Sequence, residues 1–344
     1  MAHGHQESGL LKETQDHGRS ETRSGPAEPV PRAWTAERME AERVVRYADL
    51  VPCLNAFIDT RSPGSEAKEN FTIIGPGVSE NPDQYVHIAE PHGFNIGGAR
   101  QPPGCVNSQH SHDTAEVFIV HRGRWRFNLG ERGEDATVEC NPGDVISLPT
   151  RMFRGFTCLP RYEGDREPGY LFAVLGGDDP GRVLWAPYVF DMAERFGLVL
   201  LANGDLVDTH AGDEVPSEIG RMPRTTAEQV ASLDALTVQE AQALVARQAP
   251  SVSTCAAPVI GGGGPLPEVD GFTVEQLTIV AGTGMTVAPS ETPQVLFVHE
   301  GRLSVSWDGG TLTLVPGDTM TVPSLLEVHI ESDAGSIAFR VAGT

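Results

Sequence analysis

Two histidines and a glutamate occupy a short stretch of the sequence, at spacings that suit a single metal ion. His110 and His112 are separated by one residue, and Glu116 follows four residues later. Side chains on a β-strand alternate between its two faces, so the two imidazoles would point to the same side of an extended stretch. A turn after His112 can then bring Glu116 back to that side. Two imidazoles and one carboxylate form a facial set of ligands for Fe(II), which leaves positions open for a substrate and O₂.

The same side chains also allow a site without a metal. His110 and His112 could be satisfied histidines of a core, with Glu116 paired to Arg154 in a buried ion pair. An arginine stays protonated in proteins and does not ligate cations, so Arg154 is not a metal ligand. If it points inward, its guanidinium fork matches a substrate carboxylate and would take part in catalysis. Both roles of Arg154, substrate contact and ion pair, stay open.

Short runs of alternating apolar and polar residues surround this motif. Between about residue 70 and residue 175 they include FTII, QYVHI, EVFIVH and RWRFNL, separated by turn sequences such as PPG, RGE and NPGD. Alternation with a period of two is typical of half-buried strands, and turn residues at such intervals join them. The pattern therefore predicts an all-β barrel or sandwich that carries the histidines on one of its strands.

Strand alternation also predicts which side chains share the interior with the histidines. The candidates for contact with a substrate are Ser108, Phe118, Trp125 and Phe127. Aromatic side chains often simply fill a core, which is the alternative for most of these positions. Arg100, just upstream, is a second candidate contact for an anion, with an ordinary surface charge as its alternative. An aromatic pocket with a cation would suit an aromatic acid.

The strand pattern occurs twice in the chain. Residues 117–149 correspond to residues 295–323, because each stretch contains a strand, a glycine, a strand, a PGD turn and a strand ending in proline. We therefore expect a duplicated barrel. In the second copy the positions of the two histidines, the glutamate and the arginine are taken by residues that make a poor metal site: Ala288, Ser290, Gln294 and Val328. His329 lies one residue further on, so strand parity turns it away from the interior.

The motif and the repeat together resemble the cupin superfamily. Its first motif, a glycine, His-x-His, a glutamate and a second glycine at fixed spacings, is matched in full by Gly104, His110, His112, Glu116 and Gly123. Its second motif is kept as Gly143 and Pro149, but the family's third histidine is replaced by Arg154. The resemblance covers both strand blocks and implies two cupin barrels of the jelly-roll type, one of them with a metal site.

Among two-cupin proteins, the chain resembles the gentisate and salicylate 1,2-dioxygenases, which hold a single iron in one barrel. This resemblance implies an Fe(II)-dependent enzyme that cleaves the ring of a small anionic aromatic substrate with O₂, such as gentisate, salicylate or a nitro-substituted salicylate. Mn(II) or another divalent metal is the alternative cofactor, at one ion per chain. Two other classes stay open because a fold does not fix a function: a metal-dependent lyase, decarboxylase or isomerase that uses no O₂, and a small-molecule binding protein without activity.

Changes of composition divide the chain into four predicted segments. Residues 1–33 are polar and rich in Gly, Ser, Glu and Pro, which predicts a disordered tail. We expect residues 34–180 to form the active barrel, led by an amphipathic helix that packs on it. Residues 181–255 then form a helical connection, and residues 256–344 form the barrel without metal ligands.

The composition limits the partners of the protein. The formal net charge is −22, which repels phosphate backbones and anionic lipid surfaces, so we expect neither nucleic acid nor a membrane as a partner. No apolar run approaches the ~18 residues of a membrane span or resembles a signal peptide. The five cysteines form no CxxC pair, which is typical of reduced thiols. These features predict a cytoplasmic protein, and association into a homo-oligomer stays open.

Overall fold

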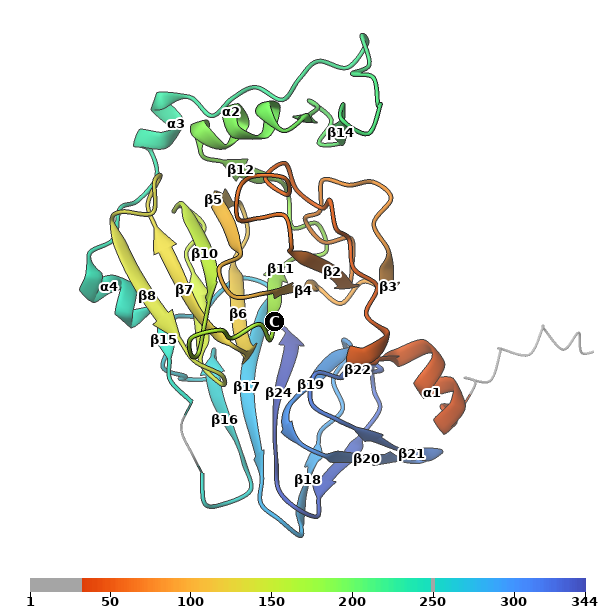
Figure 1. Ribbon diagram of the computed structural model, residues 1–344. Coiled ribbons are helices and arrows are strands. Elements are labelled where there is room, and N and C mark those ends of the chain that lie inside the picture. Colours follow the sequence, from red (N-terminus) through yellow and green to blue (C-terminus); the bar gives the residue numbers. More distant parts are fainter. Residues whose placement is uncertain (1–32, 249–250) are drawn as a thin grey trace, which may run out of the picture. The chain divides into compact units, whose positions relative to one another are not determined.

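The structure is a computed structural model that describes residues 33–248 and 251–344. The tail predicted for residues 1–33 therefore lies outside the described residues, apart from Ala33. Within the described part, the chain forms two β-barrels of two sheets each (Figure 1). The prediction of an all-β, two-barrel architecture is confirmed.

The first barrel consists of a five-stranded and a seven-stranded sheet. The five-stranded sheet holds, in spatial order, β12 (Val183–Trp185), β5 (Val106–His112), β10 (Arg154–Leu159), β7 (Arg124–Leu129) and β8 (Ala136–Cys140). The seven-stranded sheet holds β15 (Val245–Ala246), β9 (Val145–Leu148), β6 (Glu116–Arg122), β11 (Gly169–Gly176), β4 (Phe94–Gln101), β2 (Glu69–Ile74) and β3 (Val86–Ile88). The two strands with the metal motif, β5 and β6, thus lie in different sheets.

The second barrel repeats this arrangement with fewer strands. Its six-stranded sheet holds β1 (Val44–Val45), β22 (Thr319–Val322), β19 (Gln294–Gly301), β24 (Ser336–Gly343), β17 (Phe272–Ile279) and β16 (Cys255–Ile260). Its four-stranded sheet holds β18 (Thr283–Val287), β23 (Val328–Ser332), β20 (Leu303–Trp307) and β21 (Gly310–Leu314). Each barrel encloses its own apolar core. A third apolar core contains residues of both barrels, including Phe172 stacked on Phe297 with ring centroids 4.1 Å apart.

A glycine stands directly after β6 and at the end of its counterpart β19, and in both barrels it is needed for steric reasons. Gly123 and Gly301 occupy equivalent repeat positions and have φ angles of 79° and 76°, a region that favours glycine. A Cβ atom at Gly123 would lie 2.8 Å from Cα of Gly169, and one at Gly301 would lie 2.2 Å from the carbonyl oxygen of Gly335. A side chain at either position would therefore push apart two neighbouring strands.

The first helix packs on the second barrel, not on the first as the sequence suggested. Helix α1 (Ala36–Arg43) begins after Thr35, whose hydroxyl accepts a hydrogen bond from the Arg38 amide and so caps the helix. Its Met39 is fully buried in the core of the second barrel, and the following β1 pairs with β22. Figure 1 shows α1, at the red end of the colour scale, beside β22. The expected leading helix of the first barrel is therefore a prediction that the structure corrects.

A matching segment from the connection completes the first barrel. Helix α4 (Val238–Ala243) packs on β8, and β15 pairs with β9. In each barrel, the aspartate of the PGD turn binds the arginine that follows the added strand, β1 or β15. Asp318 accepts a hydrogen bond from Arg46 Nη1 at 2.6 Å, and Asp144 accepts one from Arg247 Nη1 at 2.7 Å. Each barrel thus contains a helix and a strand that precede the other barrel in the chain.

The predicted connection, residues 181–255, is only partly helical and starts too early. Its first strand, β12, belongs to the first barrel because it pairs with β5. Beyond it lie α2 (Pro187–Arg195), the hairpin of β13 (Leu198–Leu200) and β14 (Leu206–Asp208), and the short α3 (Ala227–Ala231). The remaining helix, the 3-10 turn η1 (Tyr47–Asp49), follows β1.

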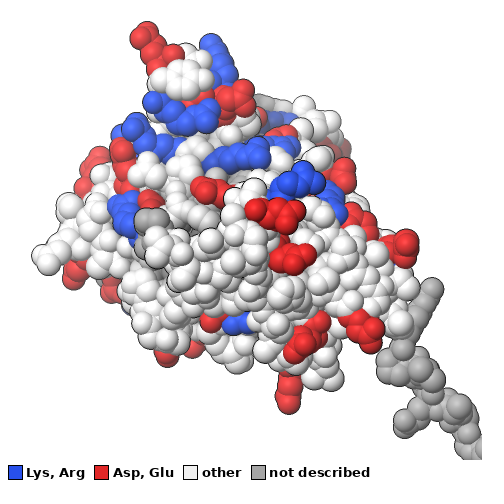
Figure 2. Space-filling view, turned by 90° about the horizontal axis from the view of Figure 1, so that it is seen from below, with Lys and Arg blue, Asp and Glu red and all other residues white. Residues whose placement is uncertain are grey.

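Two surface properties bear on the predicted partners. In the part of the chain that the structure describes, no helix is long and apolar enough to cross a membrane. On the face shown in Figure 2, acidic and basic side chains lie interspersed.

Candidate metal centre

The fold brings His110, His112 and Glu116 together inside the first barrel. Both histidines lie on β5, and Glu116 is the first residue of β6. One ligand atom from each residue lies within 4.8 Å of the others, and all three residues are buried. Among the described residues no other group of three such side chains meets. In the second barrel, Val328 is buried at the position of Arg154, and His329 is exposed, as strand parity predicts.

The position of the proton on His110 is set by the backbone. Nδ1 of His110 lies 2.7 Å from the carbonyl oxygen of Ser108, which can only accept, so Nδ1 donates and Nε2 keeps its lone pair. Burial, together with the neighbouring His112 and Arg154, lowers the pKa of His110 to about 3. The imidazole is therefore neutral, which is the form that binds metals.

Glu116 divides its two oxygens between two partners. Oε2 accepts hydrogen bonds from Arg154 Nε at 3.1 Å and from Nη2 at 3.0 Å, while Oε1 lies 3.4 Å from His112 Nε2. Burial by itself would raise the pKa of Glu116, but His112 and Arg154 outweigh burial and hold that pKa below its usual value. The carboxylate is ionised, and Oε1 remains available as a ligand.

These residues fit a divalent cation. Nδ1 of His112 is buried and has no hydrogen-bond partner among the described residues, a costly state for a polar atom. Two imidazoles with lone pairs and one carboxylate oxygen match the donor types that first-row transition metals accept. The cluster could therefore hold a divalent metal, with Arg154 behind the carboxylate as a positioning residue.

Arg154 does not reach the pocket, so the predicted catalytic contact with a substrate is corrected. Its side chain has no exposed surface. Besides the two bonds to Glu116, Nη1 donates to the carbonyl oxygen of Met152 at 3.2 Å. Arg154 is absent from the described residues that line the cavity. The ion pair, which the sequence left as the alternative, is the arrangement that the structure shows.

A second buried ion pair supports β5 through a hydrogen bond to its backbone. Lys68 and Asp59 are both inaccessible and form an ion pair. Oδ2 of Asp59 accepts a hydrogen bond from the Ser108 amide at 2.9 Å, and the Ser108 carbonyl binds His110. The chain of contacts from Lys68 to His110 positions the first ligand. Neither Lys68 nor Asp59 belongs to a motif, so sequence reasoning missed both.

A bulge in β5 explains why Ser108 is not a pocket residue. His110 pairs with Arg154, but Asn107 pairs with Phe156, so three steps on β5 match two on β10. A bulge of one residue reverses the alternation of side chains. Asn107 therefore lines the cavity in place of Ser108. Strict alternation along β5 predicted the opposite.

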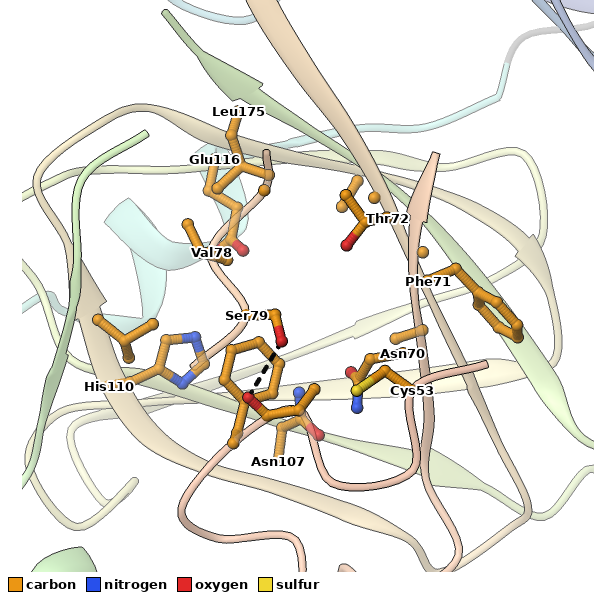
Figure 3. Close-up of a pocket in the computed structure, with 18 of the residues that line it drawn as sticks. Cys53, Asn70, Phe71, Thr72, Val78, Ser79, Asn107, His110, Glu116 and Leu175 are labelled. Carbon is orange, nitrogen blue, oxygen red and sulfur yellow. Dashed lines mark hydrogen bonds between the residues drawn. The ribbon is translucent and has the colours of Figure 1, made fainter. Parts of the chain in front are cut away.

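The cavity beside the cluster has a volume of about 70 Å³ (Figure 3). Phe118 lines it as predicted, and most of its wall is apolar, with contributions from Phe57, Phe71, Phe118, Phe156, Leu175 and Trp185. Two of these residues, Phe57 and Phe71, come from the segment before the first motif, and neither carried a functional signal in the sequence.

Three predicted substrate contacts lie elsewhere. Trp125 and Phe127 are fully buried in the core of the first barrel, where both pack against Phe156. They are core residues, the alternative that the sequence allowed. Arg100 forms an ion pair with Glu69 and is absent from the cavity wall that the structure describes. It is not positioned to bind an anion at the metal cluster.

Solved structures match most of the chain, although no family model matches the sequence and no curated protein does. The oxalate decarboxylase of Lactobacillus farciminis in its formate complex matches with a TM-score of 0.52 and 11% identity, over 87% of this chain and 85% of that one. The oxalate decarboxylase of Bacillus subtilis at pH 4.6 matches with a TM-score of 0.51 and 12% identity, over 93% and 84%. Both are two-cupin proteins. The chain therefore has the two-cupin fold.

These matches show the two-cupin fold and give no support to the narrower resemblance to gentisate and salicylate dioxygenases. A third oxalate decarboxylase structure, which concerns the substrate binding mode of that enzyme, gives a TM-score of 0.51 at 12% identity over 93% of this chain and 85% of that one. At such identities the likeness concerns the fold. The function has to be argued from the site.

Proposed function

We propose that the protein is a metal-dependent lyase of the decarboxylase class that acts on a small carboxylic acid. The observation that carries this proposal is the cluster of His110, His112 and Glu116, which lies at the wall of a small, mostly apolar cavity. A divalent cation in the cluster would supply a Lewis acid that holds and polarises a carboxylate or carbonyl oxygen. The rest of the chemistry depends on what the surrounding side chains do.

The charges around the cluster favour an anionic ligand. Arg154 neutralises Glu116 through its two hydrogen bonds, and His110 is neutral because its pKa is about 3. The positive charge of a bound cation would therefore remain largely uncompensated by the protein. A substrate carboxylate is the natural counter-charge in a site that is shielded from water.

The apolar walls of the cavity favour the loss of carbon dioxide. Phe118, Phe156 and Leu175 keep bulk water away from a bound carboxylate. A carboxylate surrounded by such side chains is poorly solvated, while the transition state for its loss as a neutral molecule spreads the charge and needs less solvation. The protein would thus favour cleavage of the bond to the carboxylate carbon, which releases CO₂ and leaves an electron pair on the substrate carbon that takes up a proton from water.

The size of the cavity supports a small substrate over an aromatic one. Its volume of about 70 Å³ is roughly half of the ~150 Å³ that admits a benzene ring in an engineered apolar cavity. This space suits an acid of a few carbon atoms. The cavity therefore favours the lyase over the ring-cleaving dioxygenase expected from the sequence. The matching solved structures are decarboxylases, enzymes of the same reaction class.

The experiment starts with anaerobically purified protein, whose metal content is measured before and after Mn(II) or Fe(II) is added. A panel of small oxo and hydroxy acids is then tested for release of CO₂ and uptake of O₂. We expect about one metal ion per chain and CO₂ release without O₂ uptake. The variant His110→Ala should lose the metal and the activity, whereas His329→Ala, at the exposed histidine of the second barrel, should keep both.

Two outcomes would overturn the proposal. Protein that binds no divalent metal after loading would show that the cluster is a metal-free ion-pair site. Turnover of hydroxybenzoates with one O₂ consumed per substrate would establish the dioxygenase instead.

A further inference from the structure

The wall of the cavity away from the metal cluster carries polar side chains but no positive charge. The polar residues of the cavity lining include Cys53, Asn70 and Asn107, and none of the described lining residues is a lysine or an arginine. In Figure 3, Asn70 and Cys53 lie on the side of the pocket away from His110. This wall can hydrogen-bond to a ligand, but it cannot neutralise an anion.

Asn70 has a buried amide nitrogen, Nδ2, to which no described protein group is hydrogen-bonded. Its backbone pairs with that of Cys53, through hydrogen bonds of 2.8 and 3.2 Å in the two directions. Residues that face each other in an antiparallel bridge project their side chains to the same face, and here that face is the cavity. Asn70 is only 9% exposed, yet its Nδ2 is buried without a partner among the described residues. Such an atom costs free energy until it is paired.

Asn107 adds a second amide whose orientation is fixed. Its Oδ1 accepts a hydrogen bond of 2.8 Å from Nε2 of Gln101, and Gln101 is itself fully buried. Because the oxygen is occupied by Gln101, the NH₂ group of Asn107 is left to donate. Asn107 lines the same cavity as Asn70, so two amide donors serve one ligand.

We infer that Asn70 and Asn107 form a subsite for an uncharged oxygen at the end of the substrate away from the metal. The inference rests on the proposed function, in which the other end of the substrate is a carboxylate at the metal cluster. The substrate is then a monoanion with a carbonyl or hydroxyl oxygen at its far end. A second carboxylate there would be buried without a counter-charge, which proteins strongly disfavour. Sites built around hydrogen bonds discriminate sharply against analogues that cannot make them.

The test uses pairs of probes that differ only in the charge of the far group. Mn(II)-loaded protein is titrated by calorimetry with malonate and its monoamide malonamate, and with succinate and its monoamide succinamate. Oxalate is unsuitable because both of its carboxylates can contact one metal ion. At one of the two chain lengths, we expect the monoamide to bind at least about tenfold more tightly than the diacid.

Variants of the two amides assign the preference to its residues. Asn70→Leu should weaken binding of the monoamide by about tenfold and leave Mn(II) affinity unchanged. Asn107→Leu provides an independent variant if the change at Asn70 impairs folding. Asn55→Ala, an exposed asparagine that does not line the cavity, serves as the control and should behave like the unmodified protein.

The inference would be overturned by diacids that bind as tightly as the monoamides at both lengths, or by monoamides that do not bind at all. A preference unchanged in both leucine variants would also overturn it. Its failure is distinguishable from failure of the proposed function, because a protein that binds no Mn(II) refutes both, whereas a metal-loaded protein without the preference refutes only the subsite.

Discussion

Oε2 of Glu116 receives two hydrogen bonds from one guanidinium, at 3.1 Å from Arg154 Nε and 3.0 Å from Arg154 Nη2. Arg154 occupies the position at which the cupin motif has a third histidine. In this protein the residue binds Glu116, one of the three candidate metal ligands. The arrangement keeps Glu116 ionised and turns its other oxygen toward His112, so the cluster offers three side chains that could hold a metal.

Removing the charge of Arg154 should reveal this positioning role. Arg154→Met leaves the buried Glu116 carboxylate without its counter-charge, and we expect the metal-free protein to lose ~3–5 kcal/mol of unfolding free energy. A bound Mn(II) would supply the missing positive charge, so the metal should stabilise this variant more than it stabilises the unmodified protein. Urea unfolding with and without Mn(II) measures both effects. Equal stabilisation of the two proteins by metal would argue against the role.

The ion pair of Lys68 and Asp59, which binds the backbone of β5, predicts that a residue outside the cluster of metal ligands affects metal affinity. Asp59→Asn weakens the ion pair with Lys68 and the support of Ser108, whose carbonyl holds His110. We expect Mn(II) affinity to fall by about 10–100-fold, as for other partners of metal ligands. Asp165→Asn, at a buried aspartate that pairs with Arg161 away from the cluster, is the matched control. The same loss in both variants would show a general effect on folding.

The buried carboxyl of Glu80 predicts how stability depends on pH. Burial raises its pKa to about 8, although hydrogen bonds from Trp185 and Ile58 oppose the shift. The folded state therefore holds this proton more tightly than the unfolded state, in which the pKa is near 4.5. The stabilisation is complete below about pH 4.5 and declines as the pH rises to about 8, on the order of 1 kcal/mol per pH unit.

Glu80→Gln should flatten this part of the profile, because glutamine does not titrate. Urea unfolding between about pH 5 and pH 8 measures the slope for both proteins. Glu163→Gln, at an exposed glutamate, should retain the slope of the unmodified protein. A profile that Glu80→Gln leaves unchanged would show that Glu80 is ionised in the folded protein.

The packing of α1 on the second barrel predicts a large effect from one methionine. Met39 is fully buried, so Met39→Ala should cost ~2–5 kcal/mol of unfolding free energy. Val238→Ala on α4, where the side chain is 59% exposed, should change it by less than ~0.5 kcal/mol. Chemical denaturation of both variants makes the comparison. A small effect at Met39 would mean that α1 is not part of the folded core.

The proximity of His110, His112 and Glu116 was predictable from the sequence, because it follows from the alternation of side chains along a strand and the short distance to the next strand. Alternation on β5 places His110 and His112 on one face, and Glu116 begins the next strand in the chain, β6, which lies in the other sheet of the barrel. The bulge at Ser108 was not predictable, since its cause is the register between β5 and β10. Asn70 and Asn107 were missed for a related reason, because an asparagine beside a cavity has no sequence pattern of its own.

The two exchanged strands, β1 and β15, left a weak signal in the sequence. Val44 to Arg46 reads VVR, and Val245 to Arg247 reads VAR, each after a helix capped by threonine. Each arginine binds the aspartate of a PGD turn. Comparison of these short stretches would have extended the repeat, but only contacts between distant parts of the chain show which barrel each one completes.

The exchange of β1 and β15 makes the two barrels unequal when the chain is cut between them. The first barrel would stay whole, because α4 and β15, which complete it, precede such a cut. The second barrel would be separated from α1 and β1, which precede the first barrel in the chain. The barrel with the candidate metal ligands is therefore contained in one fragment, whereas the barrel without them is complete only in the uncut chain.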